Sequence, residues 1–221
     1  MKWILAAGGS IDQIWFGKEL EQIRKDASGQ WKYMGIDAGV RTLLDAGIKP
    51  DYVIGDFDSV TPEEKESYLM HFAEKTVLDP VKDDTDMEAA LRLAVSMGAE
   101  EIRIYGATGS RMDHTLTNMR LLAIPMEAGI PAVIMDPNNR ITLISKETEL
   151  KREKQYGRYI SLLPFEGPVK GITLKGFKYP LEEGTLSYTG SLGVSNEITE
   201  EIGQIIFEEG RLFMMETKDE A

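Results

Sequence analysis

In residues 1–135, short apolar runs alternate with longer segments in which apolar residues recur every three or four positions. The short runs cover residues 2–7, 32–37, 52–54, 76–78, 101–105 and 132–135. This alternation is typical of parallel strands that are joined by crossover helices. We therefore predict an N-terminal α/β domain over residues 1–138, with a mostly parallel sheet and flanking helices.

Two segments between these runs carry start signals for a helix. Thr61 is followed by Pro62 and Glu64, so the chain has a capping threonine, a proline at the first helical position and a glutamate three residues after the cap. Thr85 and Glu88 repeat the capping spacing, and the apolar residues that follow recur at helical intervals. We predict that a helix begins at each of these places.

The pattern changes after residues 136–139 (Asp-Pro-Asn-Asn). From there, glycine and proline separate short strand-like runs at residues 158–163, 169–175, 193–198, 204–208 and 211–216, and no segment of helical length shows helical periodicity. Residues 209–210 (Glu-Gly) suit a tight turn that would join the last two runs as a hairpin. We expect a C-terminal all-β domain, a sandwich or small barrel, over residues 139–221.

Composition excludes several kinds of site and partner. The chain has no cysteine, which removes disulfides, thiol nucleophiles and cysteine-ligated zinc, and its two histidines, His71 and His114, lie far apart in the sequence. A formal net charge of −12 argues against binding to nucleic acid, which requires a basic surface. The N-terminal apolar run is too short for a signal peptide, and no run is long enough to span a membrane. We expect a cytoplasmic protein with no nucleic-acid or membrane partner.

Acidic residues gather where the predicted strands end. Residues 55–59 (Gly-Asp-Phe-Asp-Ser) follow one strand, and residues 83–86 (Asp-Asp-Thr-Asp) lie at the start of a predicted helix. Crowded carboxylates need a counter-charge, which a hard divalent cation such as Mg²⁺ supplies. Because ligands bind at the carboxyl ends of strands in α/β sheets, Asp56 and Asp58 are candidate metal ligands. Residues 83–86 suit a helix N-terminus equally well.

The loop at residues 106–114 (Gly-Ala-Thr-Gly-Ser-Arg-Met-Asp-His) is a further candidate. Arg111 is able to hold a phosphate with two hydrogen bonds, and Asp113 adds a carboxylate at the start of a predicted helix, although a plain surface Arg–Asp pair explains both equally well. Asp37 repeats the pattern of an acid at a strand end. Several carboxylates and one arginine at a single sheet edge favour metal-assisted phosphoryl chemistry.

Taken together, these motifs resemble those of the thiamine pyrophosphokinases of the bacterial type. The matching segments, in the order of the family, are residues 37–39, 55–59, 84–86, 109–114 with Asn118 beyond, and 195–196. The resemblance implies transfer of the pyrophosphoryl group of ATP to the hydroxyl of thiamine, giving thiamine diphosphate and AMP. It also implies an α/β catalytic domain that binds Mg²⁺ and nucleotide, a β-sandwich that binds thiamine, and a homodimer with active sites at the subunit interface.

The resemblance also implies roles for individual residues. The Mg²⁺ ligands are Asp56, Asp58 and Asp86. The nucleotide-phosphate site is completed by Asp37, Arg111 and Asp113, and the thiamine pocket is lined by Ser195 and Asn196. The catalytic residues are Arg111, Asp86 and Asp113, and either of these two aspartates is a candidate acceptor of the hydroxyl proton.

Two other interpretations fit part of the sequence. Residues 52–60 are similar to the nucleophile motif of haloacid-dehalogenase-type phosphatases, in which Asp56 would form an aspartyl phosphate and Asp58 would act as acid and base. That class has no evident use for the all-β half of the chain. A non-enzymatic sensor, in which Mg²⁺ or nucleotide only orders loops, is the second alternative.

Overall fold

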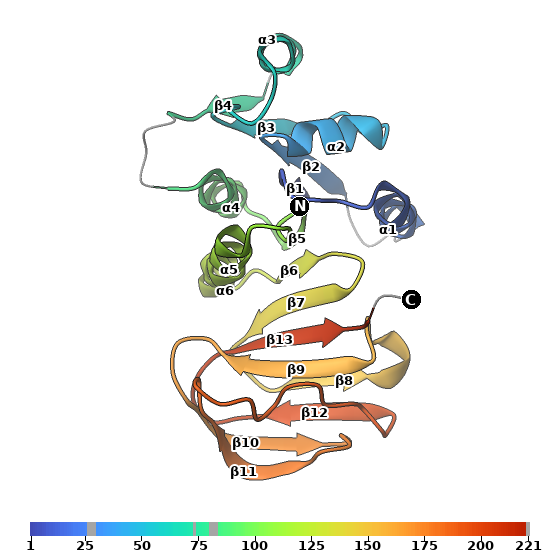
Figure 1. Cartoon of the computed structure of the whole chain (residues 1–221), viewed down its shortest axis with the longest axis vertical. Coiled ribbons are helices and arrows are strands. Elements are labelled where there is room, and N and C mark those ends of the chain that lie inside the picture. Colours follow the sequence, from blue (N-terminus) through green and yellow to red (C-terminus); the bar gives the residue numbers. More distant parts are fainter. Residues whose placement is uncertain (26–29, 73, 80–83, 220–221) are drawn as a thin grey trace. The chain divides into compact units, whose positions relative to one another are not determined.

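The computed structural model describes residues 1–25, 30–72, 74–79 and 84–219. The chain forms two compact units, Met1–Pro137 and Asn138–Ala221. None of the helices in the described ranges has both the length and the apolar character needed to cross a membrane. Figure 1 shows the helices gathered in the first unit and antiparallel strands in the second.

The first unit is built on a parallel sheet. Its strands lie in the order β4-β3-β2-β1-β5-β6, and each neighbouring pair is parallel. The bounds are β1 (Lys2–Ala6), β2 (Trp31–Ile36), β3 (Tyr52–Gly55), β4 (Lys75–Val77), β5 (Glu101–Tyr105) and β6 (Ala132–Met135). The predicted strands are therefore confirmed, with ends shifted by one residue at most. The central strands are apolar because helices cover both faces of the sheet.

The helices are α1 (Gln13–Lys25), α2 (Gly39–Asp45), α3 (Pro62–His71), α4 (Asp86–Ser96), α5 (Met112–Leu121) and α6 (Ala123–Glu127). Figure 1 shows α1 and α2 on one face of the sheet and α4 to α6 on the other. Both predicted helix starts are confirmed. Thr61 and Glu64 form a reciprocal capping box at α3, and the Thr85 side chain accepts a hydrogen bond from the Glu88 N–H at α4.

The second unit is a β-sandwich, as predicted for the C-terminal half. One sheet contains β7 (Asn139–Ile144), β13 (Leu212–Thr217) and β9 (Tyr159–Pro164). The other has the order β11-β10-β12-β8, with bounds β11 (Leu181–Leu186), β10 (Val169–Lys175), β12 (Ile202–Ile206) and β8 (Thr148–Lys151), and a single 3₁₀ turn, η1 (Arg152–Lys154), follows β8. The core contains side chains from both sheets, including Ile160, Leu212, Leu174 and Ile205.

The predicted hairpin between residues 204–208 and 211–216 is wrong, because β12 and β13 belong to different sheets of the sandwich. After β12 the chain stays beside β10: the Glu208 N–H donates to the Lys170 carbonyl at 3.1 Å, and the Lys170 N–H donates to the Glu209 carbonyl at 3.2 Å. Gly210, at φ +105°, then lets the chain cross to the other sheet.

The prediction of a strand at residues 193–198 is also wrong. The segment makes two isolated bridges, Ile160 with Asn196 and Phe177 with Ile198. Ser195 has φ +57° and Gly193 has φ +101°, which no regular strand accommodates. The segment instead covers the free edge of β9, to which it donates and from which it accepts backbone hydrogen bonds. The sequence pattern does not predict β7, β8 or β11. Strands β8 and β11 are largely polar, whereas half of the residues of β7 are apolar.

Candidate functional site

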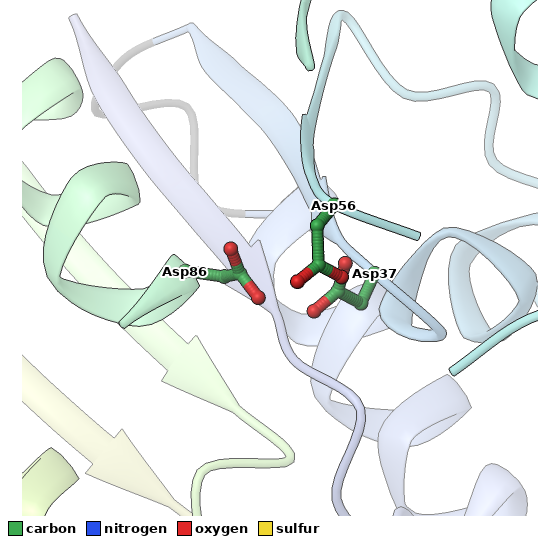
Figure 2. A group of neighbouring side chains, drawn as sticks. All are labelled: Asp37, Asp56 and Asp86. Carbon is green, nitrogen blue, oxygen red and sulfur yellow. The ribbon is translucent and has the colours of Figure 1, made fainter. Parts of the chain in front are cut away.

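Three carboxylates meet at the carboxyl edge of the parallel sheet. Asp37 directly follows β2, Asp56 directly follows β3, and Asp86 is the first residue of α4. One oxygen from each side chain lies within 4.8 Å of the others, and Figure 2 shows the three groups facing one another. Strands β2 and β3 are parallel neighbours with Ile36 opposite Ile54, so the two strand-end aspartates are held side by side.

The backbone at this edge is shaped to bring these carboxylates together. Asp37 has φ +48° and Phe57 has φ +57°, and the Phe57 N–H donates to Asp37 Oδ1 at 3.1 Å. At Gly55 a Cβ atom would lie 1.9 Å from Asp37 Oδ1. Glycine is thus required at position 55 for the Asp37 side chain to turn towards Asp56.

Side chains beneath the edge anchor this turn. The Phe57 ring is buried against Tyr68 and Phe72 of the α3 segment and against Val40 of α2. Lys65 on α3 donates from Nζ to the Asp56 carbonyl at 2.5 Å. These contacts anchor the chain at Asp56 and Phe57 to α3, and Asp56 as a whole is 8% exposed.

Burial and the neighbouring carboxylates together raise the pKa of Asp37 to about 8. Burial is the main cause, followed by the hydrogen bond to Asp86 and by repulsion from Asp86 and Asp56, while the Phe57 N–H acts in the opposite direction. A proton on Asp37, beside Asp86, is therefore favoured at neutral pH. A cation that entered the cluster would take the place of this proton.

Asp58 lies next to this group but outside it. Its side chain is exposed, its backbone N–H donates to Asp56 Oδ1 at 3.0 Å, and repulsion from Asp56 raises its pKa. Within the described residues, the carboxylates that form a group of three with mutual distances under 4.8 Å are those of Asp37, Asp56 and Asp86. Asp84 is exposed, and Asp83 lies outside the described residues.

Arg111 and Asp113 form an ion pair at the start of α5. Arg111 Nη2 donates to Asp113 Oδ2 at 2.6 Å, and the two side chains are 70% and 65% exposed. The guanidinium, together with the His114 backbone N–H, lowers the pKa of Asp113 to about 2. Neither residue belongs to the carboxylate group. His114 is exposed, and Asn118 donates from Nδ2 to the Ala107 carbonyl at 2.8 Å.

In the β-sandwich unit, Asn196 is buried and its carboxamide is engaged with the backbone. Nδ2 donates to the Tyr179 carbonyl at 2.8 Å, and Oδ1 accepts from the N–H groups of Tyr179 at 3.0 Å and Glu197 at 2.9 Å. Ser195 is exposed, and its N–H donates to Ser161 Oγ at 3.0 Å. Asn196 therefore fixes the segment that carries Tyr179.

A pocket of about 150 Å³ opens beside Asn196. Its walls include Leu174, Tyr179, Leu181 and Leu192. The pocket is small for an organic ligand and mostly apolar, with the Asn196 amide as a polar wall. Sequence reasoning found Asn196 but missed the apolar residues, because a pocket wall and a strand core have the same composition.

Comparisons with known proteins cover both units. Residues 25–134 match the family model of the thiamin pyrophosphokinase catalytic domain, and residues 147–212 match that of the thiamin pyrophosphokinase vitamin B1 binding domain. The thiamine pyrophosphokinase of Bacillus subtilis (strain 168) is 36% identical over 188 residues, which cover 85% of this chain and 87% of the relative. The chain belongs to the thiamine pyrophosphokinase family.

Solved structures of this enzyme family have the same fold. The crystal structure of the Bacillus subtilis thiamine pyrophosphokinase covers 100% of each chain with a TM-score of 0.86 and 32% identity. That of the thiamin pyrophosphokinase from Geobacillus thermodenitrificans has a TM-score of 0.82 and 33% identity, and covers 100% of this chain and 99% of its own. The three clustered aspartates and Arg111 lie in the region that matches the catalytic domain, and Asn196 lies in the region that matches the vitamin B1 binding domain.

Proposed function

We propose that this chain transfers the pyrophosphoryl group of ATP to the hydroxyl of thiamine in a Mg²⁺-dependent reaction, giving thiamine diphosphate and AMP. The observation that carries the proposal is the meeting of Asp37, Asp56 and Asp86 within 4.8 Å at the ligand-binding edge of the sheet, in a chain of this family.

The three carboxylates fit Mg²⁺. The ion prefers oxygen ligands and is usually held by a few carboxylates together with substrate phosphates. Burial, followed by the neighbouring carboxylates, raises the pKa of Asp37, and a divalent cation would neutralise the negative charge of this cluster. We propose that Asp56, Asp58 and Asp86 would hold the ion, with Asp37 beside them. When bound, Mg²⁺ supplies charge neutralisation and polarises the phosphoryl group that is attacked.

The protein's own residues have three tasks in this proposal. The guanidinium of Arg111 is exposed and has a planar pair of N–H donors that suits phosphate oxygens. When the nucleotide binds, Arg111 would release Asp113 and donate these hydrogen bonds to a phosphate. Once Arg111 has left it for the nucleotide, Asp113 is no longer held at a pKa of about 2, so Asp86 and Asp113 both stay candidate acceptors of the hydroxyl proton. The turn of residues 55–57 fixes the distance between the ligands and therefore the position of the phosphates.

We propose that the β-sandwich unit supplies the thiamine site. Ser195 belongs to this site, and Asn196 forms a wall of its apolar pocket.

We also propose a homodimer, in the cytoplasm, whose active sites lie at the subunit interface. If each site uses both chains, an inactive Asp56→Asn protein and an inactive Asn196→Ala protein should regain partial activity once their subunits have exchanged. Exchange that is demonstrated by mass spectrometry without recovery of activity would mean that one chain builds the whole site.

The decisive test follows the label of ATP that carries ³²P on its γ-phosphate. Attack at the β-phosphorus delivers the label to thiamine diphosphate and releases one AMP for each product molecule. Stoichiometric ADP would instead indicate an ordinary kinase, and labelled free phosphate without thiamine would favour a phosphatase with Asp56 as nucleophile. Binding of Mg²⁺ and ATP without any turnover would favour the sensor.

A further inference from the structure

The loop between β5 and α5, residues 106–111, is tied down at its start and in its middle. The Gly9 N–H donates to the Gly106 carbonyl at 2.9 Å. Asn118 of α5 donates to the Ala107 carbonyl at 2.8 Å, and Thr108 Oγ1 donates to Asp136 Oδ2 at 2.9 Å. Asp136 directly follows β6, the strand next to β5, so this last bond joins two neighbouring strand ends.

On one side the loop lies directly against the turn after β1. A Cβ atom at Gly9 would lie 2.3 Å from the Gly106 carbonyl oxygen and 2.6 Å from that of Thr108. Gly106 has φ +69°, and a Cβ atom there would lie 2.5 Å from the Ala7 carbonyl oxygen. The backbone is therefore blocked on this side by the β1 turn, and the Thr108–Asp136 hydrogen bond fixes its other side.

Arg111 is the last residue of this loop and the N-cap residue of α5. Its guanidinium is 70% exposed and pairs with Asp113, which is only two residues away, so the ion pair moves with the backbone that carries it. Gly109 and Ser110, which link Thr108 to Arg111, are both exposed. A hydrogen bond to a carboxylate is among the stronger ones in proteins, so Thr108 is the nearest firm point before Arg111.

We infer that Asp136, acting through Thr108, is a positioning residue for the nucleotide: it holds the loop so that Arg111 meets the triphosphate. The inference rests on the proposed function, because it takes the ligand of Arg111 to be a nucleotide phosphate. Asp136 is a strand-end acid like Asp37 and Asp56, yet it is not part of the carboxylate group. Its carboxylate holds a loop in place.

The test is Thr108→Val, which keeps the shape of the side chain and removes the hydroxyl. We expect the KM for Mg·ATP to rise about tenfold, while the KM for thiamine changes less than twofold. Thr108→Ser should restore the wild-type KM. Thr142→Val, which removes a threonine hydroxyl bound to the Met214 carbonyl in the sandwich unit, is the matched control and should leave both KM values unchanged. Equal rises in both KM values, or no rise, in Thr108→Val would overturn the inference.

A double-mutant cycle separates this role from a general loss of structure. Asp136→Ala alone should raise the KM for Mg·ATP at least as much as Thr108→Val, and the double variant should be within twofold of Asp136→Ala, because both substitutions remove the same bond. Asp136→Asn, whose carboxamide oxygen still accepts a hydrogen bond, should stay closer to wild type. Independent, multiplying effects of Thr108→Val and Asp136→Ala would contradict the proposed link.

Amide hydrogen exchange gives a readout that does not depend on turnover. Without substrates, Thr108→Val should accelerate the exchange of the amides of residues 107–110 about tenfold, and Thr108→Ser should not. Unchanged exchange in Thr108→Val would overturn the inference. A wild-type protein that forms no thiamine-dependent AMP would count against the proposed function, and hydrogen exchange would still decide whether Thr108 and Asp136 hold the loop.

Discussion

Binding of Mg²⁺ to the carboxylate cluster should depend steeply on pH, because the ion competes with a proton on Asp37. The pKa of Asp37 is raised from 3.8 to about 8. Below that pH, the apparent dissociation constant for Mg²⁺ is multiplied by one plus the ratio of protonated to ionised Asp37. The apparent dissociation constant for Mg²⁺ should therefore be about 10-fold larger at pH 7, and about 100-fold larger at pH 6, than its limiting value above pH 9.

The assay is isothermal titration of the nucleotide-free protein with Mg²⁺ from pH 6 to pH 9, in two buffers with different protonation enthalpies. At pH 7 the difference between buffers should show release of about 0.9 proton per ion. Asp37→Asn should bind Mg²⁺ more weakly than wild type and lose most of the pH dependence, and Asp113→Asn should keep it. A wild-type dissociation constant that is constant between pH 6 and pH 8 would refute this reasoning, as would an unchanged slope in Asp37→Asn.

The same pKa shift predicts the stability of the metal-free protein. The folded state holds the Asp37 proton more tightly than the unfolded state, so this group's contribution is fully present below about pH 4. This contribution to stability is lost as the pH rises to about 8, and above that pH the free energy of unfolding no longer changes because of Asp37. Asp37→Asn should therefore be more stable than wild type at pH 8 in EDTA, by at least about 1 kcal/mol after screening is allowed for. Equal unfolding temperatures of the two proteins at pH 8 would contradict the raised pKa.

Further substitutions test other parts of the site. Asp58→Asn should remove most turnover at moderate Mg²⁺, because loss of a metal contact costs several kcal/mol of transition-state stabilisation. The circular dichroism spectrum should be unchanged. Near-normal activity would exclude Asp58 as a ligand. Gly55→Ala places a Cβ atom 1.9 Å from Asp37 Oδ1 and should weaken Mg²⁺ binding at least about tenfold. The control is Gly17→Ala in α1, where the added Cβ atom meets no atom within 4 Å. This control should raise the free energy of unfolding by about 0.5–1 kcal/mol in urea titrations. Asn196→Ala removes the buried carboxamide that pairs with the N–H and the carbonyl of Tyr179, and it should cost about 1–3 kcal/mol of unfolding free energy. An unchanged free energy of unfolding would contradict these contacts.

The sequence by itself determined the strands of the parallel sheet, the starts of α3 and α4, and the presence of acids at strand ends. These features are local. Thr61 and Thr85 cap helices through groups three residues away, and an apolar run identifies a buried strand wherever its neighbours come from. Since parallel strands share an edge, the placement of Asp37 and Asp56 at one site also followed from the pattern.

Only the tertiary structure decided which side chains meet there. Asp37 turns towards Asp56 because both Asp37 and Phe57 adopt left-handed backbone and Gly55 leaves room, and Asp58, two residues from Asp56, remains exposed. In the sandwich, β12 and β13 were separated into two sheets by hydrogen bonds with Lys170, almost forty residues earlier in the chain. The Asn196 carboxamide is likewise hydrogen-bonded to the backbone N–H and carbonyl of Tyr179. A sequence pattern records which groups are polar, whereas their partners are set by backbone dihedrals and by pairings between distant segments, which no local spacing encodes.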